Sequence, residues 1–367
     1  MALSGGLPSG FLVTRMCRIC IVSDDLAGPP DEGVRKFTVA ISAALGRTHD
    51  VAVLTTSQAS PVAGVRSIPA SKTFLSRPLR AAIRQIEPDV LIYATHRSAT
   101  YFSFIRARIL AAYAPSAQIV LLGLQTRRHR WWQRQLIRLI RPDLVIVQSS
   151  ANQEYLEGIG CRAAVIHSGV DAETFQPVDD ERRHALRVQY GITGESPVVL
   201  HVGHLQAGRG IAILGERVRS GGCQVLLVAS SSTTQEEAVR RQLEQAGVRI
   251  VSEYLPRIEE LYQLADCYVF PVATTDNAIE VPLSVLEALA CDLPVVTTRF
   301  GGLPAMFPGP SHPGLVFVAT PAELVSETLR LCRQRVSGLR PLSLPYSWEA
   351  AANGLLARAI EAQRRVA

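Results

Sequence analysis

The feature that most constrains the fold is a series of short apolar runs, rich in Val, Ile and Leu, that recurs along the whole chain. The runs are continuous, without polar alternation, which is the pattern of parallel strands buried on both faces of a sheet. Stretches with helical periodicity lie between them, and this alternation predicts right-handed βαβ units and an α/β fold with doubly wound sheets. The expected strands are 18–23, 51–54, 89–94, 118–122, 143–147 and 163–166, then 198–202, 224–228, 249–251, 267–270, 294–297 and 315–318. The expected helices are 33–45, 75–86, 131–140, 208–218, 235–245, 258–264 and 283–290.

The strand and helix pattern occurs twice, and 367 residues are too many for one ordinary domain. The two halves join at 178–197, a polar segment that ends in turn residues. We expect a poorly ordered leader at 1–17, a first domain at 18–180, a second at 190–345 and a closing helix at 346–367. Ligands bind beyond the carboxyl ends of strands in open α/β sheets, so the site is expected in a cleft between the domains.

Cysteine usage and hydropathy exclude several classes. The seven cysteines are odd in number and scattered, which argues against a disulfide framework. Cys17 and Cys20 form a lone CxxC that runs into an expected strand, whereas a redox motif begins a helix. No apolar run approaches the roughly 18 to 20 residues of a spanning helix, and the opening segment does not resemble a signal peptide. We expect a cytoplasmic protein without a metal site, because no Cys or His cluster has zinc spacing.

Charge is uneven along the chain. Up to Pro177 there are 20 Lys and Arg against 12 Asp and Glu, and the remainder has 18 against 20. Residues 127–141 combine six arginines with an apolar stripe of Trp132, Leu136, Leu139 and Ile140. This segment is either a core helix with a solvated basic face or a peripheral contact with an anionic membrane or lipid phosphate. Nucleic-acid binding is not expected, since no recognition module accompanies the charge.

Residues 23–33, SDDLAGPPDEG, follow the first expected strand and open the first helix. Gly33 at a helix start lets a ligand approach backbone N–H groups, which favours anions. The segment is not GxGxxG, so a dinucleotide fingerprint is absent, and a simple turn with an N-cap remains an equal alternative.

Residues 202–210, VGHLQAGRG, lie where a strand ends at Gly203 and a helix begins near Gly210. His204 and Arg209 flank this loop, where a diphosphate would lie. Arg offers a permanent charge with several donors, and His204 would serve either protonated or as a neutral donor. A surface Arg and an ordinary loop His are the alternative. His201, inside the strand, is expected to be structural.

Residues 277–296 contain a helix that starts near Pro282 and Leu283. The N–H groups at its start, around Leu283 and Ser284, would face the cleft and hold sugar hydroxyls or phosphate. Glu287 sits in this apolar helix, and an ionised carboxylate there needs a partner, which two ribose hydroxyls would supply. The alternative is an ordinary helix with one exposed Glu.

Together these motifs resemble glycosyltransferase family 4, the large retaining group with the GT-B architecture of two Rossmann-like domains facing across a cleft. Further segments are similar to family motifs: VIHSGVD at 165–171, PRIEELY at 256–262, FGGLP at 300–304 and YSW at 346–348. The resemblance spans nearly the whole second half and is patchier in the first. It implies that Glu287 holds the donor ribose, that Arg209 and His204 bind the diphosphate, and that the loop at Glu32–Gly33 covers the donor phosphates.

The sequence departs from the family pattern in three places. The family separates its paired glutamates by seven residues, whereas six lie between Glu280 and Glu287, so that Ile279 stands at the matching position. Glu280 remains a candidate for reaching the donor sugar through a changed loop. The family often has a His after the strand near Gly123, but this strand continues into Leu124 and Gln125, which leaves His96 as a substitute on the acceptor side. Ala305 replaces the Glu of the "GGLPE" loop.

We therefore expect a hexosyltransferase that moves a sugar from a nucleotide-diphosphate donor to a hydroxyl acceptor with retention, as the resemblance implies. No cofactor is expected besides this co-substrate, and the absence of Asp-x-Asp fits a metal-independent site in which Arg209, His204 and helix N-termini stabilise the leaving diphosphate. The rival interpretation is a non-catalytic nucleotide-sugar-binding or scaffold protein on the same fold. A nicotinamide-dependent dehydrogenase lacks its glycine fingerprint here.

Overall fold

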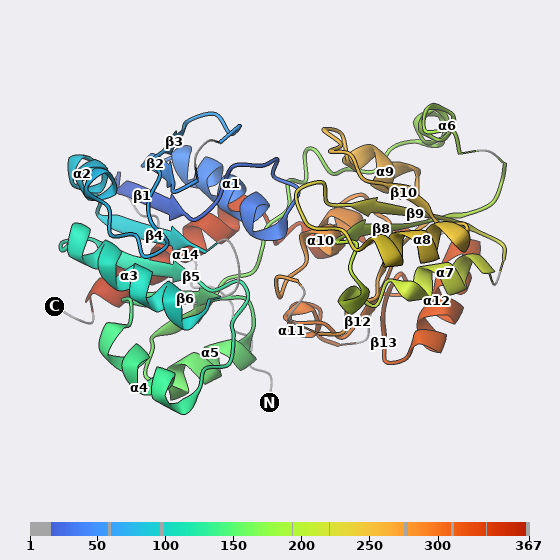
Figure 1. Ribbon diagram of the computed structural model, residues 1–367. Helices are drawn as coiled ribbons and strands as arrows, with labels where there is room; N and C mark the ends of the chain where they lie inside the picture. The colour runs from blue at the N-terminus through green and yellow to red at the C-terminus, as the bar shows by residue number, and fades with distance from the viewer. Residues whose placement is uncertain are drawn as a thin grey trace.

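The computed structural model describes residues 16–57, 60–95, 99–192, 194–219, 221–274, 278–309, 312–334 and 336–364. It contains two α/β lobes side by side (Figure 1). Most of the expected leader, residues 1–15, and the acceptor-side candidate His96 lie outside the described residues. None of the described helices has the length and apolar character needed to cross a membrane.

The first domain is built on a parallel sheet of order β3-β2-β1-β4-β5-β6-β7. Both faces are covered: α1 and the C-terminal α14 pack on one face, while α2, α3 and α5 pack with the other. The central strands are therefore apolar at nearly every position, as in β4, where all five residues are buried. The strands are β1 (Arg18–Ser23), β2 (Asp50–Thr55), β3 (Val65–Ser67), β4 (Val90–Ala94), β5 (Gln118–Leu122), β6 (Leu144–Val147) and β7 (Ala163–Val165). The helices are α1 (Gly33–Gly46), α2 (Arg77–Ile86), α3 (Tyr101–Tyr113), α4 (Trp131–Ile140) and α5 (Ser150–Gly158).

The second domain has a parallel sheet of order β10-β9-β8-β11-β12-β13. Its strands are β8 (Val198–Gly203), β9 (Gln224–Ala229), β10 (Arg249–Val251), β11 (Cys267–Phe270), β12 (Val295–Thr298) and β13 (Leu315–Val318). Its helices are α6 (Asp180–Gln189), the short 3-10 turn η1 (Ala207–Arg209), α7 (Ala212–Arg219), α8 (Glu237–Gln245), α9 (Glu259–Leu264), α10 (Leu283–Ala290), α11 (Leu303–Met306), α12 (Pro321–Arg333) and α13 (Arg340–Ser343). The predicted α/β class with two doubly wound domains is confirmed.

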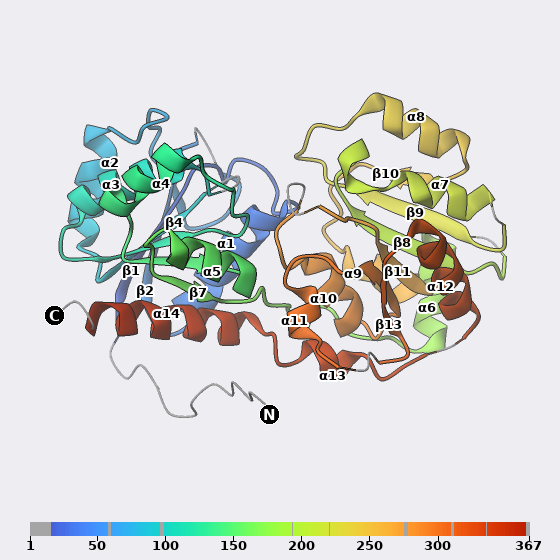
Figure 2. The ribbon, with the colours of Figure 1, turned by 90° about the horizontal axis from the view of Figure 1, so that it is seen from below.

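The chain crosses between the domains twice. After β7 it enters the second domain, and after α13 it returns as α14 (Trp348–Arg364), which lies along the first domain (Figure 2). Trp348 at the start of α14 packs edge-on against Phe37 of α1, with ring centroids 5.4 Å apart. The closing helix thus belongs physically to the first domain, whose apolar face it covers.

The polar segment at 178–197, predicted as the join between the domains, contains a helix that was absent from the prediction, because residues 180–189 form α6. Asp179 caps this helix, and Leu186 is buried in the second-domain core. Arg183 and Arg187 both bind Asp266 next to β11, which fastens the polar helix to the domain. The helices α3 and α5 and the short strand β3 were also absent from the prediction. The segment that forms α3 is apolar on most sides, so it carries little helical periodicity.

Candidate functional site between the two domains

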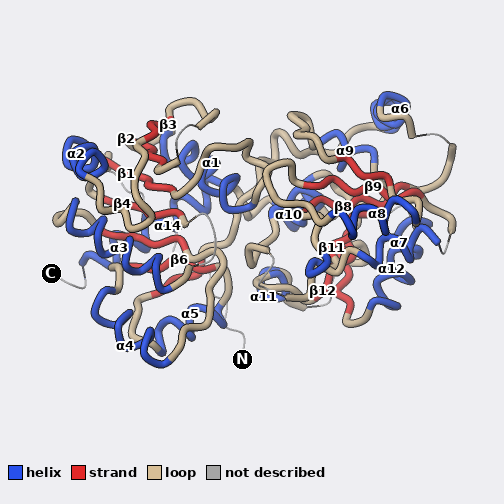
Figure 3. The backbone as a smooth tube through the Cα atoms, viewed as in Figure 1, coloured by secondary structure: helices blue, strands red, loops and turns tan. Residues whose placement is uncertain are grey.

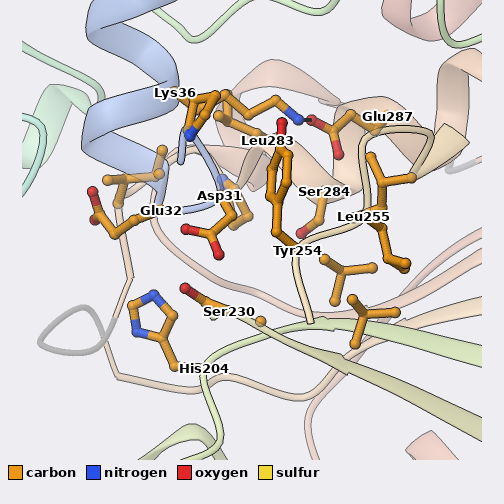
Figure 4. Close-up of a pocket in the computed structure, with 18 of the residues that line it drawn as sticks. Asp31, Glu32, Lys36, His204, Ser230, Tyr254, Leu255, Leu283, Ser284 and Glu287 are labelled. Atoms are coloured by element: carbon orange, nitrogen blue, oxygen red, sulfur yellow. Dashed lines mark hydrogen bonds and ion pairs between the residues drawn. The ribbon is translucent and has the colours of Figure 1, made fainter. Parts of the chain in front are cut away.

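A cavity of about 360 Å³ opens between the domains, at the carboxyl ends of β1, β8 and β9. The segments that line it are mostly loops (Figure 3) and helix N-termini, as expected for a doubly wound fold. Among the predicted site residues, the structure brings Gly33, Gln125, Gly203, His204, Arg209, Leu283, Ser284 and Glu287 to the walls of this one cavity. Figure 4 shows several of these side chains arranged around it.

The loop before α1 forms the first-domain wall. Glu32 caps α1 by accepting a hydrogen bond from the backbone of Arg35 at 3.0 Å, so the N-cap interpretation holds while the loop also lines the cavity. Arg35 is buried and ties the loop together through Asp25 at 3.1 Å and the Pro29 carbonyl at 3.0 Å. A Cβ on Gly33 would come within 3.2 Å of Ile279, so glycine here permits close approach of the second domain.

Glu287 is buried, 4% exposed, and it already has two protein partners. Lys36 of α1 forms an ion pair with its Oε1 at 2.5 Å, and the Tyr262 hydroxyl donates to Oε2 at 2.9 Å. Figure 4 shows the Lys36 amine reaching Glu287 from the opposite domain. From the sequence, a ligand was expected to be the partner of this carboxylate. In the folded chain the partner is a cation that lies 251 residues away in the sequence.

The second-domain wall carries a cluster of cationic and imidazole groups behind β8. Arg209 is 5% exposed, and burial lowers the pKa of its guanidinium to about 10, which leaves it charged at neutral pH. Burial, followed by the Arg209 charge, lowers the pKa of His204 to about 4. Of the two states left open for His204, the neutral donor is thus the one present at neutral pH. A Cβ on Gly203 would lie 3.1 Å from the Arg209 guanidinium, so glycine leaves room for it.

His201 is structural, as expected from its place inside β8. Its ring is fully buried, and Nδ1 lies 2.8 Å from the Val269 carbonyl oxygen of β11. Burial lowers the pKa of His201 to about 4, outweighing the opposite effect of that carbonyl. A neutral ring with its proton on Nδ1 satisfies this bond.

Leu283 and Ser284 begin α10 directly at the cavity wall, after the N-cap Pro282. The first N–H groups of a helix have no acceptor inside it and carry partial positive charge. This helix start therefore presents donors beside Glu287, one turn away on the same helix, to anything bound in the cavity.

Asp31 links the two walls. Its carboxylate accepts hydrogen bonds from the backbone and the hydroxyl of Ser231, both at 2.7 Å, and from the Ser232 hydroxyl. Burial alone would raise the pKa of Asp31, but these hydrogen bonds from Ser232 and Ser231 lower it below the ordinary value. The Asp31 contacts close the loop before α1 onto the loop after β9. Nothing in the motif comparison singled out this residue.

Glu280 does not line the cavity, which corrects the expectation that a changed loop brings it to the donor. Its carboxylate is 2% exposed and binds Ser149, at 2.8 Å, and Asn152 of the first domain. Burial raises the pKa of Glu280, although the Ser149 bond and the Arg128 charge oppose this. Because the family position is shifted by one residue, Ile279 faces the cavity and Glu280 joins the domains.

The FGGLP segment also acts between the domains. A Cβ on Gly302 would lie 2.4 Å from the Gln148 carbonyl oxygen, and one on Gly301, whose φ is +52°, would collide with the Glu280 carbonyl. Gln148 in turn accepts from the backbone of Val281 at 3.0 Å. This network of Gln148, Glu280 and the glycine pair was not found from sequence. The double glycine was its only visible signal.

Part of the second domain is similar in sequence to known proteins. Residues 196–334 match the family described as glycosyl transferases group 1. Related proteins include D-inositol 3-phosphate glycosyltransferases of Segniliparus rotundus, 31% identical over 53% of this chain and 45% of that protein, and of Corynebacterium jeikeium, 30% identical over 58% and 56%. The chain thus spans about half the length of the curated relatives it matches.

Solved structures share the whole two-domain fold. HepE from Anabaena, determined in complex with UDP and glucose, superposes with a TM-score of 0.71 at 18% identity, covering 94% of this chain and 99% of that one. Sucrose-phosphate synthase from Thermosynechococcus elongatus gives a TM-score of 0.71 at 19% identity, covering 94% and 100%. The protein therefore has the two-domain GT-B fold, and residues 196–334 of its second domain match the group 1 glycosyltransferase family.

Proposed function

We propose that the protein transfers a hexose from a nucleotide-diphosphate sugar to a hydroxyl acceptor with retention of anomeric configuration. The observation that carries the proposal is one interdomain cavity lined by the Glu287 carboxylate, the Arg209 guanidinium and the start of α10. The carboxylate suits the two ribose hydroxyls, and the guanidinium and helix N–H groups suit a diphosphate. The family resemblance supports retention.

In this proposal the protein acts mainly on the leaving group. As the bond from sugar to phosphate breaks, negative charge grows on the diphosphate, and Arg209 is already charged and held in a buried setting. Such preorganised charge stabilises the transition state more than it would in water. Neutral His204 adds a hydrogen-bond donor and no charge. We extend the proposal to transfer without a divalent cation.

Donor use tests the proposal. UDP-, GDP- and ADP-sugars would be assayed for binding and hydrolysis with and without EDTA, beginning with UDP-glucose because HepE was solved with UDP and glucose. Glu287→Ala and Arg209→Ala should each lower donor turnover at least about tenfold, since each removes a charged contact of about 1.5 to 3 kcal/mol. Glu287→Gln keeps one oxygen that accepts from Lys36, and its amide NH2 can donate to the Tyr262 hydroxyl. A loss of turnover in this variant, with folding retained, therefore reports on the lost carboxylate charge.

Glu244→Ala, which removes an exposed carboxylate from α8, is the matched control and should retain wild-type turnover. Wild-type rates in both Glu287→Ala and Arg209→Ala would refute the assignments. An inverted product, resolved by proton NMR of the anomeric signal, would refute retention. Loss of turnover in EDTA, restored by a divalent cation, would refute the metal-independent form.

The second candidate is a nucleotide-sugar-binding or scaffold protein that does not turn the donor over. Two observations favour it: Glu280 is turned into the domain contact, and Lys36 already neutralises Glu287. Tight donor binding without hydrolysis or transfer, over the whole donor panel and with hydroxyl acceptors present, would support this candidate against the transferase.

A further inference from the structure

The helix α4 turns an apolar stripe toward solvent. Trp131 is 76% exposed and Leu139 is 78% exposed, and Trp132 and Leu136 are also exposed. The residue that α4 buries is Ile137, on the opposite side of the helix. Of the two alternatives left open for this segment, the core helix therefore does not hold for Trp132, Leu136 and Leu139, whereas Ile140 of the same stripe packs against the first-domain core.

The exposed stripe continues onto α3. The Tyr101 ring lies 5.7 Å from the Trp132 ring and 5.9 Å from the Phe102 ring, and Phe102 is itself 66% exposed. We call this area the α3–α4 surface; it consists of Phe102, Trp131, Trp132, Leu136 and Leu139. Contiguous exposed aromatic and aliphatic side chains are unusual on the surface of a soluble monomer, and they commonly mark a site of interaction with another protein or a membrane.

The same segment is strongly basic. No Asp or Glu occurs between Arg127 and Arg141, and Arg128, Arg130, Arg134, Arg138 and Arg141 are exposed. Several of these arginines contact uncharged groups: Arg134 donates to the His129 carbonyl at 2.9 Å, and Arg138 to the Ile159 carbonyl at 3.3 Å. Because such acceptors carry no formal charge, the positive field of the helix is not neutralised by them.

We propose that the α3–α4 surface and the arginines beside it dock the protein onto an anionic lipid bilayer. Trp and Phe rings favour the interfacial region of a membrane, and Leu side chains favour the acyl boundary beneath it. Arg side chains extend toward lipid phosphates from the edge of a buried apolar face. A second protein copy or a nucleic acid would not use both features, since two such surfaces repel each other and bare phosphates do not require the exposed Leu139.

The position of α4 relates this surface to the cavity. Its apolar anchor Ile137 belongs to the face of the sheet opposite α14, and Figure 2 shows α4 and α14 on opposite sides of the first domain. The loop that follows β5 carries Gln125 at the cavity and then runs directly into Arg127 and α4. Docking through α4 would therefore hold the membrane against an element that residues 126–130 connect to the cavity wall. The inference does not depend on which reaction occurs in the cavity.

Vesicle flotation with the full chain tests the proposal. The protein should float with vesicles of phosphatidylcholine containing about 30% phosphatidylglycerol and remain unbound with phosphatidylcholine alone. The pair of changes Arg130→Gln and Arg134→Gln should weaken partitioning about 30-fold, from roughly a fivefold loss per basic residue. The pair Trp131→Ala and Leu139→Ala should weaken it at least about tenfold.

Tryptophan emission gives a second readout that reports on α4. The chain has three tryptophans, and Trp348 is buried, so a blue shift on adding anionic vesicles would come from Trp131 and Trp132. Matched controls are Val188→Ala, which removes an exposed apolar side chain from α6, and Arg241→Gln on α8. Both should float like the wild type.

Absence of flotation with anionic vesicles, or equal flotation of the α4 variants and the wild type, would overturn the proposal. Sedimentation as a dimer that Trp131→Ala and Leu139→Ala convert to a monomer, without vesicle binding, would instead assign the surface to a second copy of the chain.

Discussion

At the scale of single residues, Glu287 shows how the fold decides what a carboxylate can bind. The helix around it is apolar, so the charge needs compensation, and Lys36 and Tyr262 supply it. His201, His204 and Arg209 present a related case behind β8, where three groups that can carry protons lie in a buried setting. Only Arg209 keeps its charge at neutral pH.

The two histidines predict an acid-labile fold. Burial lowers the pKa of His201 and of His204 to about 4, against about 6.5 in an unfolded chain. The folded state therefore binds fewer protons between these values. The stability that comes from keeping these two histidines neutral is fully present above about pH 6.5. It is lost as the pH drops toward 4, by up to about 1.4 kcal/mol per pH unit for each histidine.

Urea unfolding midpoints between pH 7.5 and 5 would measure this dependence. His204→Gln should reduce the dependence of the unfolding free energy on pH by the contribution of one histidine. His184→Gln, on the exposed side of α6, is the matched control and should keep the wild-type dependence. Equal slopes in wild type and His204→Gln would show that His204 is not held neutral by the fold.

At the scale of elements, the loop from β12 to α11 shows why two glycines stand where this loop meets the first domain. Gly302 approaches the Gln148 carbonyl so closely that a Cβ would lie 2.4 Å from it, and the contacting atom is backbone, which cannot swing aside. Gly301 needs both the space and a left-handed backbone, with φ of +52°. The two glycines therefore allow the loop to pack tightly where the domains meet, and α11 begins directly after them at Leu303.

Gly302→Ala should destabilise the protein by about 2 kcal/mol or more, because the first domain must shift to admit the methyl group. Gly46→Ala is a sharp control, since a Cβ there meets nothing within 4 Å and alanine is favoured at the end of α1. Urea unfolding of both variants would compare them, and similar midpoints would contradict the steric argument.

At the scale of the whole molecule, several polar contacts join the domains around the cavity. The Lys36–Glu287 pair and the Asp31–Ser231 hydrogen bonds lie at its walls, and the Glu280–Asn152 contact lies outside it. Interfaces of this polar kind between domains favour motion between more and less closed arrangements. The Asp31 contact joins two surface loops and is the simplest to remove without disturbing either core.

Asp31→Ala should therefore open the molecule. We expect a larger radius of gyration in small-angle X-ray scattering, together with donor binding weakened about fivefold or more, from the loss of charge-assisted hydrogen bonds. Asp50→Ala, at the exposed start of β2, is the control. Scattering from Asp31→Ala that superposes on the wild-type curve would remove Asp31 from the contacts that close the domains.

The sequence alone determined the two parallel sheets, the start of α10 and the loops that bear His204 and Arg209. These features depend on local signals, namely the spacing of apolar residues that become buried and the turn residues that end each element. It did not determine α6, since a helix held by Arg183 and Arg187 to a distant Asp266 has too little apolar periodicity to be recognised. Tertiary structure decided what local pattern cannot encode: that Lys36 meets Glu287 across 251 residues, that Glu280 faces the other domain, and that the stripe on α4 faces outward. Each depends on how the elements are placed against one another, and a helix stripe has the same spacing whether it is covered by a core or by solvent.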